Sequence, residues 1–208
     1  GDSKFEGTVS SIRLRQEIRD AARDDSIKGI LLNIDSPGGT FAGTDQLAKD
    51  IQTARNIKPV RAFIDDLGAS AAYWIASQAE QVSATPTTEI GSIGTVVVVE
   101  DTSGAAEMQG VVVHVISTGP MKGAFAEGAP ITEEMIDTLQ KEVEQANEFF
   151  MEAVQSGRGM DMKAVRALAT GDTFFAKEAK ALGLIDKIET FDEAVESLIE
   201  QVSPRSRT

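Results

Sequence analysis

Cysteine is absent from this sequence of 208 residues, and histidine occurs only once, at His114. Without cysteine the chain forms no disulfides and no thiolate metal sites. The single histidine and the scattered carboxylates show no spacing typical of metal ligands, so we expect no metal centre. Long apolar runs are missing as well. The run Val96–Val99 is far shorter than the roughly 20 apolar residues of a transmembrane helix and is typical of a strand.

Basic residues are scarce relative to acidic ones. The chain has 20 Lys and Arg against 33 Asp and Glu, which gives a net charge of −13. This balance argues against nucleic acid as a partner, because nucleic-acid binding relies on clustered Lys and Arg. It argues equally against binding of anionic membrane surfaces by the folded chain. An acidic surface that keeps the protein soluble is the simpler interpretation.

The N-terminus shows no signal-peptide pattern. The chain begins with Gly1-Asp2-Ser3 and has no initiator Met, so we interpret it as a trimmed or processed fragment. Hydrophobic residues make up 41% of the sequence and charged residues 25%, which is the ordinary range of globular proteins. We therefore expect one domain over residues 1–208, with a frayed tail at 203–208.

Hydrophobic patterning alternates between strand and helix periods along the chain. The strand at 28–35 is apolar on both faces, as in a buried parallel sheet. Thr132 is placed to cap a long helix with an apolar stripe from Ile136 to Val154. We expect an α/β fold with a mainly parallel sheet flanked by helices, and a helical C-terminal portion. The predicted helices cover 11–24, 40–55, 69–78, 103–109, 132–157, 161–168, 177–182 and 192–201, and the predicted strands cover 28–35, 59–64, 81–84, 95–100, 111–116 and 183–188.

Two short segments complement each other chemically. Ile34–Gly39 closes a predicted strand with a glycine turn, and Gly68–Tyr73 opens a predicted helix further along the chain. The N–H groups of Gly38 and Gly39 are candidate donors for an oxyanion hole. Ser70 would stand at the start of the helix, where the helix dipole favours developing negative charge. Together the two segments indicate acyl transfer by a serine nucleophile.

Both segments also have simpler interpretations. A serine at the start of a helix is usually only a cap, and a glycine pair is often only a tight connection between a strand and a helix. Two features of Ser70 favour the chemical interpretation. Its neighbours Gly68, Ala69, Ala71 and Ala72 are all small, which leaves room for a substrate carbonyl. It also follows a predicted strand, near the sheet edge where open α/β folds bind their ligands.

A serine nucleophile needs a base, and the sequence offers two candidates. His114 is the only histidine, but it lies in the apolar segment 111–116, where a packed or edge-strand residue is the simpler interpretation. Lys122 lies in the loop Ser117–Gly123, which contains glycine and proline. Burial lowers the pKa of a lysine from about 10.4, so a buried lysine can be neutral and accept a proton. Otherwise a loop lysine is a solvated charge.

The sequence resembles the signal peptide peptidase A family of serine proteases, within the superfamily of Clp protease and crotonase folds. The match covers nearly the whole chain, and a Clp protease/crotonase-like α/β fold is what it implies. The matching motifs, in order, are Asp35–Gly39, Ala69–Tyr73, Gly91–Gly94, Gly157–Gly159, Gly171–Phe174 and Ala181–Asp186.

The resemblance implies a Ser-Lys dyad. Ser70 matches the family's nucleophile, Lys122 matches its general base, and Gly38 and Gly39 match the oxyanion-hole turn, with no metal or organic cofactor required. Family members cleave signal-peptide remnants at the bacterial cytoplasmic membrane. They assemble into rings or domes in which a neighbouring protomer can supply the lysine. The resemblance thus implies a peptide or protein substrate and a homo-oligomer with shared active sites.

The chain departs from the family pattern in two respects. Many members have two glycines after the serine, whereas this chain has Ala71 and Ala72. In this respect the chain resembles phage and prophage members, which are soluble and cytoplasmic. The strand that usually precedes the first helix is missing, and so is the N-terminal transmembrane anchor. We therefore expect membrane association only through an anchor that is not part of this sequence.

These observations leave a leading hypothesis and three alternatives. The leading hypothesis is a serine endopeptidase that cleaves signal peptides or other apolar segments in a groove that prefers small or aliphatic residues. The first alternative is a phage or prophage protease of the same family that matures capsid or scaffold protein. The second is a crotonase-type acyl-CoA enzyme, which would need carboxylates in the site and a cleft for CoA. The third is an inactive oligomeric scaffold.

Overall fold

The computed structural model describes residues 10–203, in two compact units. Unit 1 contains residues 10–94 and 149–203, and unit 2 contains residues 95–148. Strands and helices alternate through most of the chain, so the predicted α/β class is confirmed. Among residues 10–203, no helix combines the length and the apolar character needed to cross a bilayer. The tail predicted to be frayed covers 203–208. Ser203 instead donates to the Ile199 carbonyl through its N–H at 2.9 Å and its hydroxyl at 2.7 Å, and residues 204–208 lie outside the described range.

Unit 1 contains all of the strands that the structure describes. These are β1 (Ile30–Ser36), β2 (Val60–Ala69), β3 (Gln81–Ala84), β4 (Glu89–Gly91), β5 (Thr173–Phe175) and β6 (Lys187–Ile188). Its helices are α1 (Ser11–Arg23), α2 (Thr44–Arg55), α3 (Ala71–Ala76), α6 (Met162–Leu168), α7 (Ala176–Ala181) and α8 (Phe191–Val202). Helix α4 (Ser103–Met108) belongs to unit 2, and α5 (Glu133–Arg158) begins in unit 2 and ends in unit 1.

The long strand β2 organises the sheet. Strand β1 pairs with it in parallel, and so do β3, along residues 61–64, and β4, along residues 67–69. Strand β6 extends the sheet in parallel from β3, and β5 extends it in antiparallel fashion from β4. The register with β1 shifts between Ile64 and Gly68, so β2 bulges there. Bulges of this kind re-aim the end of a strand, and they are frequent beside active sites.

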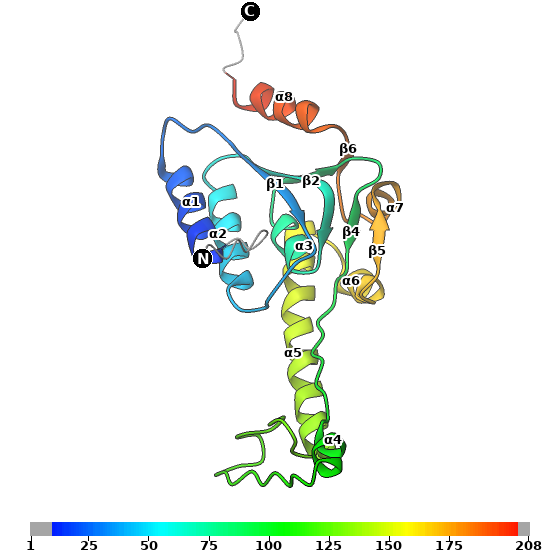
Figure 1. The fold of residues 1–208 in the computed structure, drawn as a ribbon. Coiled ribbons are helices and arrows are strands. Elements are labelled where there is room, and N and C mark those ends of the chain that lie inside the picture. Colours follow the sequence, from blue (N-terminus) through cyan, green and yellow to red (C-terminus); the bar gives the residue numbers. More distant parts are fainter. Residues whose placement is uncertain (1–9, 204–208) are drawn as a thin grey trace, which may run out of the picture. The chain divides into compact units, whose positions relative to one another are not determined.

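Alternate residues of β2 face opposite sides of the sheet. Val60 is buried in a cluster with apolar residues of α1 and α2, which lie side by side (Figure 1). Arg61 and Phe63 face α8 instead. The Arg61 guanidinium donates to the Ser197 hydroxyl at 2.7 Å, and the Phe63 ring packs edge-on against Phe191 with centroids 5.4 Å apart. The sheet is therefore covered on both faces at β2. The strand at 28–35 was predicted to be buried, but β1 is only half-buried, and its residues Asn33 and Asp35 are exposed.

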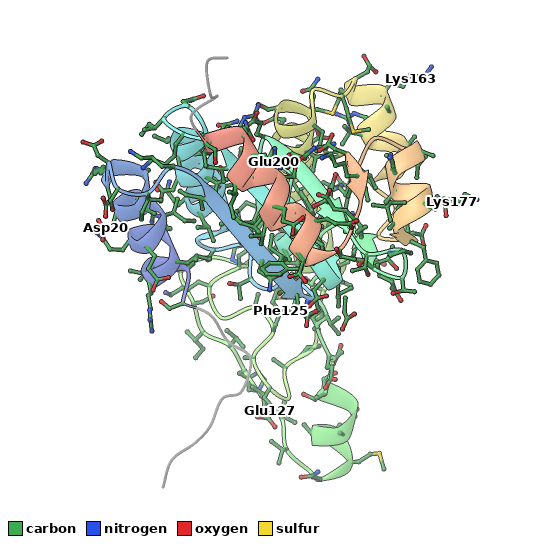
Figure 2. The ribbon with its side chains drawn as sticks, turned by 90° about the horizontal axis from the view of Figure 1, so that it is seen from above. Asp20, Phe125, Glu127, Lys163, Lys177 and Glu200 are labelled. Carbon is green, nitrogen blue, oxygen red and sulfur yellow. The ribbon has the colours of Figure 1, made fainter. Side chains whose placement is uncertain are left out.

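Charged side chains cover the outer faces of the unit 1 helices. Figure 2 shows Asp20 on α1 and Lys177 on α7 pointing away from the sheet. Ile18 of α1 and Ala176 and Ala179 of α7 are buried. This division between polar and apolar faces is the amphipathic pattern of a helix on a globular core.

Most of the predicted elements of unit 1 are present, with shifted ends. Helix α1 begins at Ser11, where the predicted helix begins, and Ser10 caps it through its side-chain oxygen. Helix α2 begins at Thr44 rather than Thr40, because residues 40–43 complete the turn that leaves β1. Strand β2 runs to Ala69, beyond its predicted end at Ile64, and the short strands β4 and β5 were not predicted.

The strands predicted in unit 2 at 95–100 and 111–116 are wrong. Both segments are extended but pair with no strand among the described residues. Val96 and Val98 are 81% and 82% exposed, and Val112 and Ile116 are also exposed. The β-branched composition that favours a strand is therefore present without a partner strand, and propensity alone does not form a sheet.

Helix α5 confirms the predicted long helix, but only part of its apolar stripe is buried. Phe150, Met151 and Val154, near its end in unit 1, are buried. Ile136, in its unit 2 portion, is 51% exposed. The stripe thus belongs to the core only where the helix enters unit 1.

An ion pair between the buried Arg158 side chain and the partly exposed Asp186 holds the end of α5 against the sheet. The Arg158 guanidinium donates two hydrogen bonds to Asp186, at 2.8 and 2.9 Å, and Asp186 also accepts the backbone N–H of Val82 at 2.7 Å. Burial opposes the charge on Asp186, but the hydrogen bonds from Arg158 and Val82 prevail and hold its pKa below the usual 3.8. The hydroxyl of Tyr73 in α3 donates to the Leu184 carbonyl close by, and burial raises the pKa of Tyr73.

We predict that Asp186→Asn destabilises the chain by about 2 kcal/mol near neutral pH, because it leaves Arg158 without its charged partner. This is less than the ~3–5 kcal/mol of a fully buried pair, since the Asp186 side chain is partly exposed. A lowered folded pKa stabilises the fold above the unfolded pKa, and this stabilisation is lost as the pH falls through the folded value. The stability gap between wild type and variant should therefore stay constant from pH 6 to 8 and shrink below about pH 4.

Urea denaturation at a series of pH values measures this gap. Glu17→Gln, which breaks the exposed Arg13–Glu17 pair at 2.8 Å, is the matched control and should cost no more than about 0.5 kcal/mol. An equal, small loss for both variants would show that the Arg158–Asp186 pair contributes no more than a surface pair.

Candidate active site

Ser70 stands at a sharp junction between β2 and α3. Its φ of 52° and ψ of −126° place it in a region that residues with a side chain rarely adopt. The junction is held from both sides: the Ser70 N–H donates to the Gly91 carbonyl at 2.8 Å, and the Ser70 carbonyl accepts the Trp74 N–H at 3.0 Å. A strained turn from strand to helix that presents a serine is also the backbone device of hydrolase nucleophile elbows.

Ser70 does not act as a helix cap. It occupies the N-cap position of α3, but its side chain accepts no capping hydrogen bond. Ser10, Asp161 and Thr190, at the N-cap positions of α1, α6 and α8, all accept one. Thr102, at the N-cap position of α4, also accepts no capping bond. The half-buried Ser70 side chain is therefore not used as a cap and has no hydrogen-bond partner among the described residues.

The glycine turn after β1 lies directly against Ser70, as the sequence predicts. At Gly38, φ is +105° and there is no room for a side chain. An added Cβ would lie 2.7 Å from the Ser70 Cβ and 2.9 Å from the Ala71 nitrogen. The register of the sheet explains this proximity, because Ser36 at the end of β1 pairs with Gly68 near the end of β2.

The backbone donors around Ser70 differ in their present partners. The Gly38 N–H donates to the Ser36 hydroxyl at 3.2 Å. Gly39 faces open space, where an added Cβ would meet nothing within 4 Å. Ala71 is the first residue of α3, and the N–H of a first helical residue has no acceptor within its helix. The Ala71 N–H is therefore a further candidate donor to an oxyanion, which the sequence did not indicate.

Ser92 is a further candidate residue of the site that the sequence did not indicate. It follows Gly91, the residue that pairs with Ala69, and its own φ is 49°. Its N–H donates to the Asp172 carbonyl at 2.7 Å. Two strained serines thus lie on neighbouring strand ends, and strained residues cluster at functional sites. The only sequence feature that pointed to Ser92 was its position in the motif Gly91–Gly94.

The candidate bases belong to unit 2. Lys122 is exposed, in a turn where its N–H donates to the Gly119 carbonyl at 3.0 Å. This turn is packed against the extended segment 111–116, since a Cβ added at Gly123 would lie 2.9 Å from Val115. His114 lies in that segment and is exposed rather than packed in a strand. The structure therefore brings Gly38 and Ser70 together within unit 1 and places Lys122 within unit 2.

Carboxylates near the site do not gather into a metal centre. Within residues 10–203, no group of three or more His, Asp or Glu side chains is arranged to hold a metal ion. Asp65 and Asp66, on the bulge of β2, are exposed.

Comparison with known sequences gives this geometry its context. Residues 52–204, which include Ser70 and Lys122, match Peptidase family S49. The chain belongs to this family. It is 30% identical to "Protease 4" of Haemophilus influenzae and to "Capsid assembly protease C" of Escherichia phage lambda, over 92% and 94% of its length. It is 28% identical to "Serine protease SPPA, chloroplastic" of Arabidopsis thaliana, over 88% of its length.

The S49 chain described here spans less than half the length of these relatives. It covers 31%, 43% and 27% of them, respectively. The resemblance to the signal peptide peptidase A family is confirmed by the family match and the relatives' names. The glycine turn at Gly38 and Gly39 precedes the region of the family match.

We predict that Gly38→Ala destabilises the fold by about 2 kcal/mol or more, because it combines an unfavourable positive φ with a clash against the Ser70 Cβ and the backbone of Ala69 and Ala71. Gly39→Ala is the matched control, one residue away, with free space and no positive φ, and should change stability by less than about 0.5 kcal/mol. Thermal or urea unfolding measures both. Equal stability of the two variants would mean that the turn does not lie against Ser70.

Proposed function

We propose that this S49 member is a serine endopeptidase with Ser70 as its nucleophile and Lys122 as its general base. The observation that carries the proposal is the strained, uncapped Ser70 with the side-chain-free turn at Gly38 against it. Membership of a peptidase family supports the reaction class. It also favours peptide hydrolysis over the acyl-CoA alternative. We infer, in keeping with the resemblance, that the fold is of the Clp protease/crotonase type.

The proposed reaction proceeds in two stages. The Ser70 hydroxyl attacks the peptide carbonyl while neutral Lys122 takes its proton, and the resulting oxyanion accepts hydrogen bonds from backbone N–H groups of the Gly38–Gly39 turn and of Ala71. Lys122 then returns the proton to the leaving amine, and the C–N bond breaks to give an acyl-enzyme. Lys122 then takes a proton from water as the water oxygen attacks the ester carbonyl. The bond to the Ser70 oxygen breaks, Lys122 returns the proton to that oxygen, and the acid is released.

We propose an apolar peptide segment as the substrate, with signal-peptide remnants as the first candidate. Small residues flank Ser70, and no charged side chain is adjacent to it in sequence. A second candidate is a capsid or scaffold protein, favoured by the match to the phage lambda capsid assembly protease over 94% of this chain. Cleavage of a signal-peptide substrate against cleavage of an intact scaffold protein distinguishes the two.

We further propose that the active form is a homo-oligomer built through unit 2. Valine and isoleucine side chains are exposed along both extended segments of this unit. The segments 95–100 and 111–116 pair with no described strand, so they offer backbone groups that another strand can bind. A lysine also acts as a base only in its neutral form, which exclusion of water favours. Assembly would supply that exclusion for Lys122, which is exposed in the single chain.

We predict that a fluorophosphonate probe labels the wild-type oligomer and that labelling is lost in Ser70→Ala and in Lys122→Ala. The first variant removes the attacking oxygen, and the second removes the base that activates it. Mass spectrometry of the labelled peptide identifies the modified serine. Ser103→Ala and Lys141→Ala, exposed or partly exposed positions in unit 2, are the controls and should label normally. Labelling that survives in Ser70→Ala would exclude Ser70 as the nucleophile, and an unlabelled wild type would favour the inactive scaffold.

We predict that the double variant Val96→Asp/Val98→Asp dissociates the oligomer, because it places charge on two neighbouring exposed apolar positions. Sedimentation velocity should give a mass well above the 22.2 kDa of one chain for wild type and close to it for the variant. Probe labelling should fall at the same time. Ile57→Asp, an exposed apolar position of unit 1, should leave the assembly intact. A monomeric wild type, or a variant that stays assembled, would contradict assembly through this segment.

A further inference from the structure

Strand β2 changes partners part-way along its length, just before it reaches Ser70. Its first part pairs with β3 as far as Ile64, and its last part pairs with β4 from Leu67 onward. Between these residues the strand bulges. The bulge packs Ile64 tightly against Gly68, where an added Cβ would lie 2.6 Å from the Ile64 Cγ2. The direction in which β2 delivers Ser70 therefore depends on the shape of this bulge.

The hydroxyl of Thr88 joins this bulge to the turn between β3 and β4. Thr88 is fully buried in that turn. Its hydroxyl lies within hydrogen-bond distance of the Asp65 carbonyl and, at 3.3 Å, of the Ile64 carbonyl, so the two carbonyls share one donor. It also accepts the Thr85 N–H at 3.1 Å and meets the Thr85 hydroxyl at 2.9 Å. The turn and the bulge are thus connected through one oxygen atom.

The same residue leads into the segment that binds Ser70 from the other side. Thr88 directly precedes β4, and the carbonyl of the last β4 residue, Gly91, accepts the Ser70 N–H. Ser70 therefore follows one of the two segments that Thr88 joins and is hydrogen-bonded to the other. Its positive φ is unfavourable by itself and persists only while its surroundings fix it. A shift of β4 relative to the bulge would release Ser70 from this conformation.

We propose that Thr88 is a positioning residue for Ser70, because its hydroxyl fixes β4 against the bulge of β2 and so holds the nucleophile in its strained orientation. This inference rests on the proposed function and adds to it a residue that acts only through the backbone. A buried carbonyl that loses its donor moves toward another one, since an unpaired buried carbonyl is costly. A misplacement of ~1 Å at a reacting group lowers the rate by about 100-fold.

Two substitutions of Thr88 separate its hydroxyl from its shape. Thr88→Val removes the hydroxyl and keeps the branched side chain, whereas Thr88→Ser keeps the hydroxyl and removes the methyl group. At saturating fluorophosphonate probe, labelling of Ser70 in the assembled protein should slow about tenfold or more in Thr88→Val and stay within about threefold of wild type in Thr88→Ser. The probe concentration at half-saturation should not change. In peptide cleavage, kcat should fall with KM unchanged, because the hydroxyl does not bind substrate.

Urea unfolding of the same variants tests the alternative that Thr88 is merely structural. Both substitutions remove buried contacts and should lower stability. A structural role would make the labelling rate follow stability, whereas a positioning role makes it follow the hydroxyl. Thr44→Val is the matched control, because Thr44 is also buried and its hydroxyl donates to the Thr40 carbonyl at 2.9 Å, at the start of α2. This variant should lose stability and still label at the wild-type rate.

A second variant covers the case in which Thr88→Val does not fold. Thr85→Val removes the hydroxyl that meets the Thr88 oxygen and leaves Thr88 in place. It should slow labelling about threefold, since the Thr88 hydroxyl then loses one of the partners that orient it. An unchanged rate in Thr85→Val would then count against the proposal. Sedimentation velocity should give the wild-type mass for each variant, because Thr88, Thr85 and Thr44 lie in unit 1.

The outcomes separate this inference from the proposed function. In a wild type that labels and cleaves, the positioning role alone would be overturned if Thr88→Val labelled as fast as wild type. It would also be overturned if Thr88→Val were slowed no more than Thr88→Ser or Thr44→Val. A wild type that neither labels nor cleaves would instead overturn the proposed function.

Discussion

The constraint on which the site depends is the contact between two stretches of backbone with no side chain between them. The turn after β1 reaches Ser70 only because Gly38 has no Cβ, and Ser70 faces that turn only because its own φ is positive. Neither conformation is favourable by itself. Both persist because the sheet register aligns the ends of β1 and β2, and the Gly91 carbonyl binds the Ser70 N–H.

Helix α3 is too short to hold this junction by its own hydrogen bonds, so the rest of unit 1 fixes its far end. The buried Gln78 amide donates to the Ala153 carbonyl of α5 at 2.9 Å. Gly157 lets α5 approach so closely that an added Cβ would overlap the Ser77 carbonyl. Arg158 then ties the end of α5 to Asp186. A chain of polar contacts thus extends from the sheet to the helix that begins beside Ser70, and sites on such rigid elements keep their geometry more precisely than sites on loops.

The sequence predicted those features that local chemistry determines. The start of the helix at residue 11, the strand over β3 and the proximity of the glycine turn to Ser70 all follow from residue types at fixed spacing. The remainder depends on partners that spacing does not reveal. Strand β4 has only three residues and is held by pairing with β2 on one side and β5 on the other. Whether the Ser70 side chain caps α3 depends on the local backbone geometry, which the sequence does not give. In unit 2 the pattern of Val96–Val99 predicted a strand, but no described residue pairs with it.

The segments 95–100 and 111–116 of unit 2, where the predicted strands are absent, bear on how the proposed activity would be controlled. Burial of these exposed, apolar, β-branched segments against further copies would stabilise the assembly by about 25 cal/mol for each Å² of apolar surface removed from water. That free energy is available to order the turn of Lys122, whereas Ser70 in unit 1 is held by contacts already present in one chain. In the proposed mechanism, the nucleophile is preorganised in every chain, and the base becomes competent only on assembly. Such a division would keep a newly made chain inactive toward apolar segments of other proteins until it meets its own copies.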